Sequence, residues 1–130
     1  MFILHRGQEL HTELQSFART HDLTSAWVTG LGGSGGVTLG FYDLATKTYH
    51  WKTYDDPLEV LNLTGNLSIV DDAPFWHVHG SFSNDTYQSI GGHVQSLTVG
   101  LTLELLITPL DTPFTRSYDD ETGLKLLCEV

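Results

Sequence analysis

Three histidines lie close together in the middle of the chain. His77 and His79 fall in the segment PFWHVHGSFS, and His93 follows the pair Gly91 and Gly92. Residues two apart in a β-strand project from the same face, so the first two imidazoles would lie side by side. The two glycines would let a returning strand approach closely and bring the third histidine to the same point. Three neutral imidazoles bind a divalent transition metal and leave one coordination position open. The spacing therefore predicts a metal site at these histidines, with zinc as the default ion.

A purely structural interpretation of the same residues is also possible. His77 and His79 would then be half-buried strand residues whose ring nitrogens find backbone partners, and His93 would be unrelated to them. The shared face of the first two histidines and the glycines before the third favour the metal site.

Two glutamates stand in apolar runs, Glu59 in PLEVLNL and Glu104 in LTLELLI. A buried carboxylate is costly unless it is hydrogen-bonded, paired with a cation or bound to a metal. Each glutamate could therefore be a metal ligand, a partner that orients a histidine, or a general base. The alternative is a strand at a sheet edge or subunit interface, where the acid reaches solvent or a backbone donor.

A glycine-rich stretch, GLGGSG at residues 30–35, matches the literal pattern of the dinucleotide-binding fingerprint. The residues that follow it, VTLGFY, have a β pattern, so no helix N-terminus is available to hold a pyrophosphate. We interpret the stretch as a glycine-rich connection between strands.

The elements that position these residues can be predicted from hydrophobic periodicity. The segment GQELHTELQSFARTH places Leu10, Leu14, Phe17 and Ala18 on one face at helical spacing. After it, SAWVTGLG predicts a strand, and GVTLGFYDLATKTYHWKTYDD predicts a hairpin with its turn at residues 43–47. Two longer strands are expected in PLEVLNLTGNLSIVDDAPFWHVHGSFS, two more in GGHVQSLTVG and LTLELLITPL, and a last one in the tail.

One early amphipathic helix followed by many strands with short connections leaves no helices for parallel crossovers. We therefore expect an α+β fold: a mostly antiparallel β-sheet, either a sandwich or a partly open barrel, with that helix. At 130 residues the chain is expected to form a single domain, 1–130.

The charge of the chain argues against direct binding to DNA or RNA. Sixteen acidic residues stand against six basic ones, which gives a formal net charge of −10, and the basic residues are scattered along the sequence. Nucleic-acid binding needs a basic patch that displaces counterions from phosphates. The N-terminus lacks the long apolar region of a signal peptide, and no apolar run approaches the length of a membrane span. We therefore expect a cytoplasmic protein with no membrane partner.

The order of these motifs resembles the stand-alone prokaryotic PPC domain, the plant and prokaryote conserved domain. The resemblance rests on GVTLGFYDLATKTYHWKTYDDPLEVLNLTGNLS, PFWHVHGSFS, GGHVQSLTVGLTLELLI and SYDDETGLKLL, and it covers nearly the whole chain. It implies a homotrimer of subunits that each carry an antiparallel sheet and a helix. It also implies a metal at His77, His79 and His93, with Glu59 matching the acid of the family's segment before Thr64.

Prokaryotic members of that family are often described as DNA-binding proteins because of their plant relatives. In those relatives the domain accompanies AT-hook segments, short Arg-Gly-Arg-Pro runs that enter the minor groove of DNA. This sequence has no such run. The resemblance therefore implies that this chain assembles into an oligomer more strongly than it implies that the chain binds DNA.

Three functions remain open at this point. The first is a trimeric binding module whose histidines hold a metal that either stabilises the assembly or receives a small anionic ligand, with a cleft between subunits as the natural place for the pocket. The second is a DNA-associated regulator, by family resemblance only. The third is a small metal-dependent enzyme, a hydrolase or lyase, in which Glu59 or Glu104 takes the proton. We rank the binding module first and the enzyme third.

Overall fold

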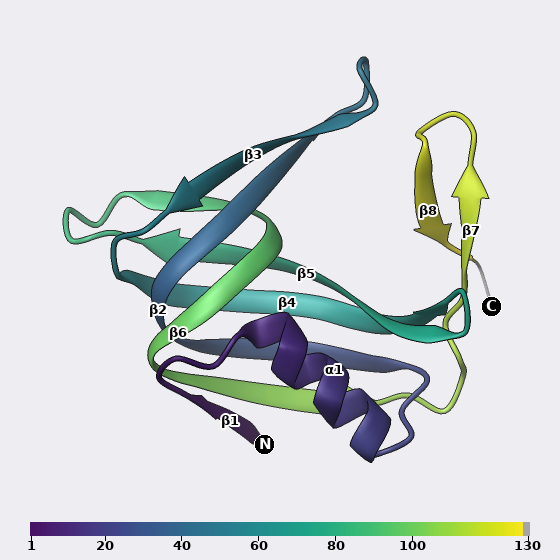
Figure 1. The fold of residues 1–130 in the computed structure, drawn as a ribbon, viewed down its shortest axis with the longest axis horizontal. Helices are drawn as coiled ribbons and strands as arrows, with labels where there is room; N and C mark the ends of the chain where they lie inside the picture. Colours follow the sequence, from purple (N-terminus) through teal and green to yellow (C-terminus); the bar gives the residue numbers. More distant parts are fainter. Residues whose placement is uncertain (129–130) are drawn as a thin grey trace.

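The computed structural model describes residues 1–128, so the last two residues of the expected domain lie outside the described part. Within that part, one helix and eight strands follow one another along the chain (Figure 1). They are β1 Phe2–His5, α1 Leu10–Thr20, β2 Ala26–Asp43, β3 Thr48–Tyr54, β4 Leu58–Val70, β5 Ala73–Ser83, β6 Ser89–Pro109, β7 Arg116–Asp119 and β8 Leu124–Leu127. No helix among residues 1–128 is long and apolar enough to cross a membrane.

The strands β1 to β6 form one sheet that curls into a partly open barrel. Their order is β1-β6-β5-β4-β2-β3, and β2 also pairs with β6. The strands β2, β4, β5 and β6 therefore close into a ring, while β1 and β3 extend it at either end. All strand ladders of this sheet are antiparallel. The expected antiparallel α+β fold is confirmed, and of the two expected forms the barrel is the one observed.

The short strands β7 and β8 form a separate hairpin. In Figure 1 this hairpin stands off the barrel, next to the turn that joins β4 to β5. The backbone N–H of Ile69 at the end of β4 donates to the carbonyl oxygen of Phe114, which ties the start of the hairpin to the barrel. The C-terminal segment is thereby held beside the middle strands.

Two strands are longer than the sequence analysis predicted. The stretch at residues 30–35 is not a connection but part of β2, and the two strands expected after residue 90 are one strand, β6. Glycines suggested breaks at these points, but here they let two strands cross closely. A Cβ at Gly32 would collide with the carbonyl oxygen of Thr102, and one at Gly100 would lie 2.7 Å from the backbone of Ser34. The pairing of β2 with β6 shifts register at these positions, so the strands bend without ending.

The core lies between the barrel wall and the helix. Alternate residues of β5 point inward, and Trp76, Val78 and Phe82 are buried there. The helix covers them with its buried face, which includes Leu10 and Leu14. The indole N–H of Trp76 donates to the carbonyl oxygen of Leu14 at 3.0 Å, so the largest aromatic of the core is also hydrogen-bonded to the helix.

Candidate metal centre

The outward face of β5 carries the first two histidines. Because Trp76 and Val78 point into the core, His77 and His79 point away from it. His93 lies on β6, directly opposite His79 in the antiparallel register. The structure therefore brings the three predicted histidines together on one surface of two neighbouring strands.

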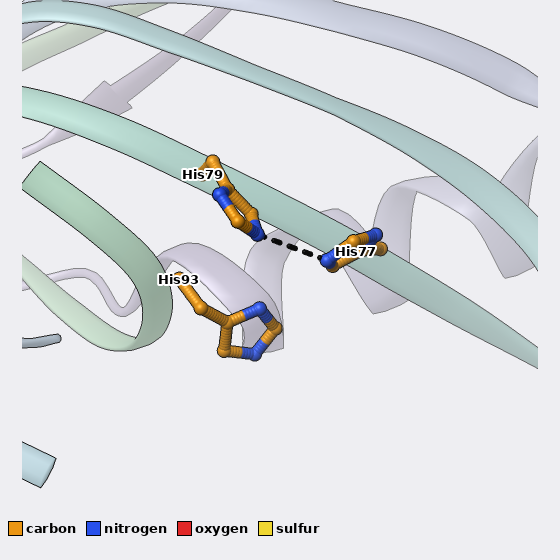
Figure 2. A group of neighbouring side chains, drawn as sticks. All are labelled: His77, His79 and His93. Atoms are coloured by element: carbon orange, nitrogen blue, oxygen red, sulfur yellow. Dashed lines mark hydrogen bonds between the residues drawn. The ribbon is translucent and has the colours of Figure 1, made fainter. Parts of the chain in front are cut away.

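The three imidazole rings converge (Figure 2). The Nε2 atoms of His77 and His79 are 3.1 Å apart. The ring centroid of His93 lies 5.2 Å from that of His77 and 5.4 Å from that of His79. One ligand atom from each residue lies within 4.8 Å of the others. Two nitrogens bound tetrahedrally to one zinc ion are separated by about 3.3 Å, close to the observed His77 to His79 distance. The cluster can therefore hold a metal ion.

One ring nitrogen in the cluster also lacks a partner. The Nδ1 atom of His93 is buried and has no hydrogen bond within the described residues. Buried polar atoms are normally satisfied, so an unpartnered nitrogen beside two other imidazoles fits metal ligation.

The surroundings of the cluster favour neutral imidazoles. Burial and the nearby charge of Arg116 lower the pKa of His77 to about 4. Burial, together with His79 and His11, lowers the pKa of His93 to about 4. Burial also lowers the pKa of His79. Neutral imidazole is the form that binds metals, so near neutral pH few protons compete with the ion.

Side chains that the sequence analysis did not select complete the surroundings. The rings of Tyr49 and Trp51, on β3, lie 5.2 and 6.0 Å from the ring of His93. On β7, an Nη2 atom of Arg116 lies 3.4 Å from Nδ1 of His77. The one feature of the sequence that could have drawn attention to Arg116 is that it is the only lysine or arginine between Lys52 and Lys125. Nothing in the local sequence shows that the C-terminal hairpin folds back to the histidines.

The glycines before His93 lie where strands approach closely. A Cβ at Gly91 would come within 2.7 Å of the carbonyl oxygen of Gly80 on β5. A Cβ at Gly92 would come within 2.9 Å of the carbonyl oxygen of Gly40 on β2. These contacts agree with the expected close approach of the strand that carries His93, and they place the two glycines beside the cluster, not among its ligands.

The two glutamates do not join the histidines. Glu59 is exposed and pairs with Ser83, four residues beyond His79 along β5. Glu104 is exposed on β6, where it faces Leu31 of β2. The metal-binding group found among the described residues contains the three histidines alone. The structure thus places both acids where a carboxylate reaches solvent.

Hollows adjoin the cluster, and a larger hollow lies elsewhere in the molecule. A recess of about 250 Å³ is lined by His79 and Thr64, and another of about 190 Å³ is lined by His93 and His11. A hollow of about 750 Å³ lies at Leu58, Glu59 and Tyr87 and includes none of the three histidines. The convergence of donor atoms, which is chemically specific, therefore indicates a candidate metal site better than the size of a hollow does.

Comparison with protein families supports the resemblance seen in the sequence. The model of the Plants and Prokaryotes Conserved (PCC) domain matches residues 1–111. No curated protein matches the chain.

Several solved structures are similar over nearly the whole chain. A protein of Ralstonia eutropha, described as a "putative DNA-binding protein", is 32% identical with a TM-score of 0.92, over 99% of this chain and 90% of that one. The "metal-containing protein" of Archaeoglobus fulgidus is 31% identical with a TM-score of 0.91, over 98% and 91%. The plant- and prokaryote-conserved (PPC) protein of Pyrococcus horikoshii is 26% identical with a TM-score of 0.91, over 99% and 90%.

Proposed function

The chain belongs to the Plants and Prokaryotes Conserved (PCC) domain family, and from that premise we propose that it is a metal-binding oligomeric module. His77, His79 and His93 bind one divalent transition metal per subunit, and the open coordination position receives a small anionic ligand. The observation that carries the proposal is the convergence of three neutral imidazoles whose donor atoms lie within 4.8 Å of one another.

Zinc is the ion that we propose for this centre. Three imidazoles without a carboxylate or thiolate suit zinc, copper, nickel and ferrous iron, whereas magnesium and calcium prefer oxygen ligands. The similar protein of Archaeoglobus fulgidus is described as metal-containing, which supports a metal but not a particular one.

We propose that the module is a homotrimer and that its subunits meet through an exposed apolar surface. Five side chains on β1, β2, β4, β6 and the N-terminus form this surface, which we call the outer apolar patch: Met1, Ile3, Leu31, Leu61 and Leu106. Their exposed fractions range from 39% for Ile3 to 81% for Met1. Contiguous exposed apolar side chains of this kind are typical of protein interfaces. Glu104 also lies in this surface, opposite Ile3 on one neighbouring strand and Leu31 on the other.

Neither alternative function is favoured by a specific observation. The enzyme hypothesis needs a general base within hydrogen-bond reach of a metal-bound substrate, and Glu59 and Glu104 lie away from the histidines. DNA binding is named in the descriptions of similar proteins, but this chain has a formal net charge of −10 and only six basic residues. Direct DNA contact is therefore not part of the proposal.

The test is the metal content per subunit, measured by elemental mass spectrometry on untagged protein, together with the native mass. We expect near-stoichiometric metal in the wild type and none in the variant His77→Ala/His79→Ala. A matched control is His50→Ala, which removes an exposed histidine of β3 outside the cluster and should leave the metal content unchanged. A wild type that contains no metal after purification and after incubation with zinc would overturn the proposal.

A further inference from the structure

A hollow of about 750 Å³ lies at one end of the barrel and includes none of the three histidines. The turns β1–α1, β3–β4 and β5–β6 gather at this end, on the left in Figure 1, and contribute Arg6, Asp55 and Asp85 to the wall of the hollow. Small-molecule sites often lie in the mouths of β-barrels and have volumes of about 300–1,000 Å³. The hollow therefore has the position and the size of a ligand pocket.

The inner wall of this hollow holds a buried hydroxyl group without a partner. Ser34 lines the hollow, is 2% exposed, and its Oγ has no hydrogen bond within the described residues. It pairs with Leu58 of β4 and Val99 of β6, which also line the hollow. Paired residues of antiparallel strands point to the same face, so the three side chains lie together. Rotation about χ1 can turn Oγ towards a ligand, which would supply the hydrogen bond that the fold does not.

The rim of the hollow is acidic. Three of its lining residues, Asp55, Glu59 and Asp85, carry exposed carboxylates, and one, Arg6, carries a guanidinium. No ion pair found among residues 1–128 includes any of these four side chains. In a chain with a formal net charge of −10, the field at the rim favours a positively charged ligand.

The β5–β6 turn presents an aromatic ring at the edge of the hollow. Tyr87 lines the hollow, is 89% exposed, and has a φ of +61°, which is uncommon for a residue with a Cβ. Asn84 holds the turn in this shape, because its Oδ1 accepts from the backbone N–H of Thr86 at 3.1 Å and of Gln88 at 2.9 Å. The turn thereby places an aromatic side chain beside the acidic rim, and aromatic faces attract organic cations.

From these features we propose that the hollow is a separate ligand site, for a small organic amine that has an apolar body and a hydroxyl group. The hydroxyl group of the ligand forms a hydrogen bond with Oγ of Ser34, and the apolar body packs on Leu58 and Val99. The ammonium group lies at the rim, near the carboxylates and the ring of Tyr87. The inference goes beyond the proposed metal-binding function and does not depend on it, because no proposed metal ligand lines the hollow.

The test is a calorimetric titration of the purified protein with three probes that share one aromatic skeleton. Tyramine carries a hydroxyl group at one end and an ammonium group at the other, phenethylamine lacks the hydroxyl, and 4-ethylphenol lacks the ammonium. We expect tyramine to bind most tightly. Loss of the hydroxyl should weaken the affinity by about 2- to 10-fold, the effect of one hydrogen bond. Loss of the ammonium should weaken it by about 3- to 30-fold.

The variant Ser34→Ala tests the buried hydroxyl group. It should bind tyramine and phenethylamine with equal affinity, because the partner of the ligand's hydroxyl group is gone. It should also resist urea at least as well as the wild type, because an unpartnered buried hydroxyl does not stabilise a fold. Ser83→Ala is the matched control: Ser83 also lines the hollow, but its Oγ donates to the carbonyl oxygen of Asn84. An unchanged preference of Ser34→Ala for tyramine would overturn the inference.

The variant Asp55→Asn/Asp85→Asn tests the acidic rim. Its preference for tyramine over 4-ethylphenol should be smaller than that of the wild type. Asp56→Asn/Asp111→Asn is the matched control, because it removes the same number of exposed carboxylates outside the hollow and should keep the preference. Equal preferences in the two double variants would show that the rim does not select the ligand.

A measurement on the wild type locates the probe without any variant. In nitrogen-15 NMR spectra, tyramine should shift the backbone N–H signals of Ser34, Leu58 and Tyr87 and leave those of His77 and His93 unchanged. No binding of tyramine at millimolar concentration, or shifts that lie outside the hollow, would overturn the inference and leave the metal proposal standing. A wild type that takes up no metal but binds tyramine in the hollow would overturn the metal proposal alone.

Discussion

At the scale of single residues, the protonation of the clustered histidines affects the stability of the fold. The pKa values of His77 and His93 are lowered from 6.5 to about 4, chiefly by burial. Between these two values the unfolded chain binds more protons than the folded one does. The free energy of unfolding of the metal-free protein should therefore fall as the pH is lowered from about 6.5 towards about 4. Urea unfolding across this pH range measures it.

The contribution of these two histidines can be separated from that of the carboxyl groups that titrate in the same range. The variant His77→Gln/His93→Gln cannot take up protons at these positions in either state. Its free energy of unfolding should depend less steeply on pH than that of the wild type. Identical pH dependence in both proteins would show that the histidines are not held neutral by the fold.

At the scale of elements, the helix α1 begins at a glutamate that acts as its N-cap. The carboxylate of Glu9 accepts from the backbone N–H of His11 at 3.2 Å and of Thr12 at 2.8 Å. Burial raises the pKa of this carboxyl, but these hydrogen bonds outweigh that effect and lower it below 4.5. Glu9→Gln should cost about 1 kcal/mol of unfolding free energy at pH 7.

That cost should disappear in acid, because a group with a depressed pKa stabilises the fold only while it is ionised. The difference between wild type and Glu9→Gln should shrink as the pH falls below about 4.5 and through the lower pKa of the folded state. Glu13→Gln, in the first turn of the same helix, is the control and should change stability by only a few tenths of a kcal/mol. A constant difference at all pH values would mean that the carboxylate charge plays no part.

The close approach of strands beside the three histidines leads to a second prediction about elements. In Gly92→Ala the new Cβ would come within 2.9 Å of a backbone oxygen of Gly40, so β6 must shift and His93 with it. We expect a loss of about 1–3 kcal/mol in unfolding free energy and weaker zinc binding. Gly36→Ala is the matched control on β2, because its Cβ would lie 3.6 Å from the nearest atom, an ordinary contact. Equal zinc affinity in both variants would contradict this placement of His93.

The sequence predicted the local features of the site better than the long-range ones. The H-x-H pair and the glycines before His93 follow from strand periodicity and close packing, and both are seen in the structure. Arg116 could not be placed, because a hairpin that folds back onto β4 is fixed by long-range contacts such as the one with Asn66. Glu59 shows the opposite limit: an apolar neighbourhood along the chain does not distinguish a buried side chain from one on the outer face of a strand.

The fold class was predictable for a similar reason. One period-3.6 segment followed by period-2 segments with turns fixes a helix and antiparallel strands, whatever their pairing. The lengths of β2 and β6 were not predictable, because Gly32 and Gly100 break strands in most sequences and here allow two strands to cross. Whether such a glycine ends a strand or lets two strands cross is decided by the strand with which it pairs.

At the scale of the whole molecule, net charge predicts how the protein meets DNA. With a formal net charge of −10 and basic residues spread over distant elements, the chain should repel a phosphate backbone. We expect no binding of duplex DNA in fluorescence anisotropy, even at low ionic strength, where electrostatic binding is strongest. A basic peptide with an AT-hook is the positive control for the assay. Salt-sensitive binding of the metal-loaded protein would show a local basic surface that outweighs the net charge.

Assembly is the other property of the whole molecule. Exposed and buried leucines on the same strand allow the proposed assembly to be tested separately from folding. Leu61 and Leu63 are neighbours on β4, but Leu61 is 52% exposed in the outer apolar patch whereas Leu63 is buried in the core. Leu61→Glu should therefore convert the proposed trimer to monomers and leave the fold intact, because the charge meets only a partner subunit. Light scattering after size-exclusion chromatography measures the mass, and circular dichroism reports the fold.

Two further variants separate a lost interface from a damaged core. Leu63→Ala should cost about 2–5 kcal/mol of unfolding free energy, because it leaves a cavity in the core, and it should not act on the interface directly. Leu44→Glu changes a leucine that is 56% exposed in the turn between β2 and β3, outside the patch, and should remain a trimer. If Leu61→Glu keeps the native mass of the wild type, the subunits meet through another surface. If the trimer of the Leu44→Glu variant also dissociates, the added charge causes the dissociation and the position within the patch does not.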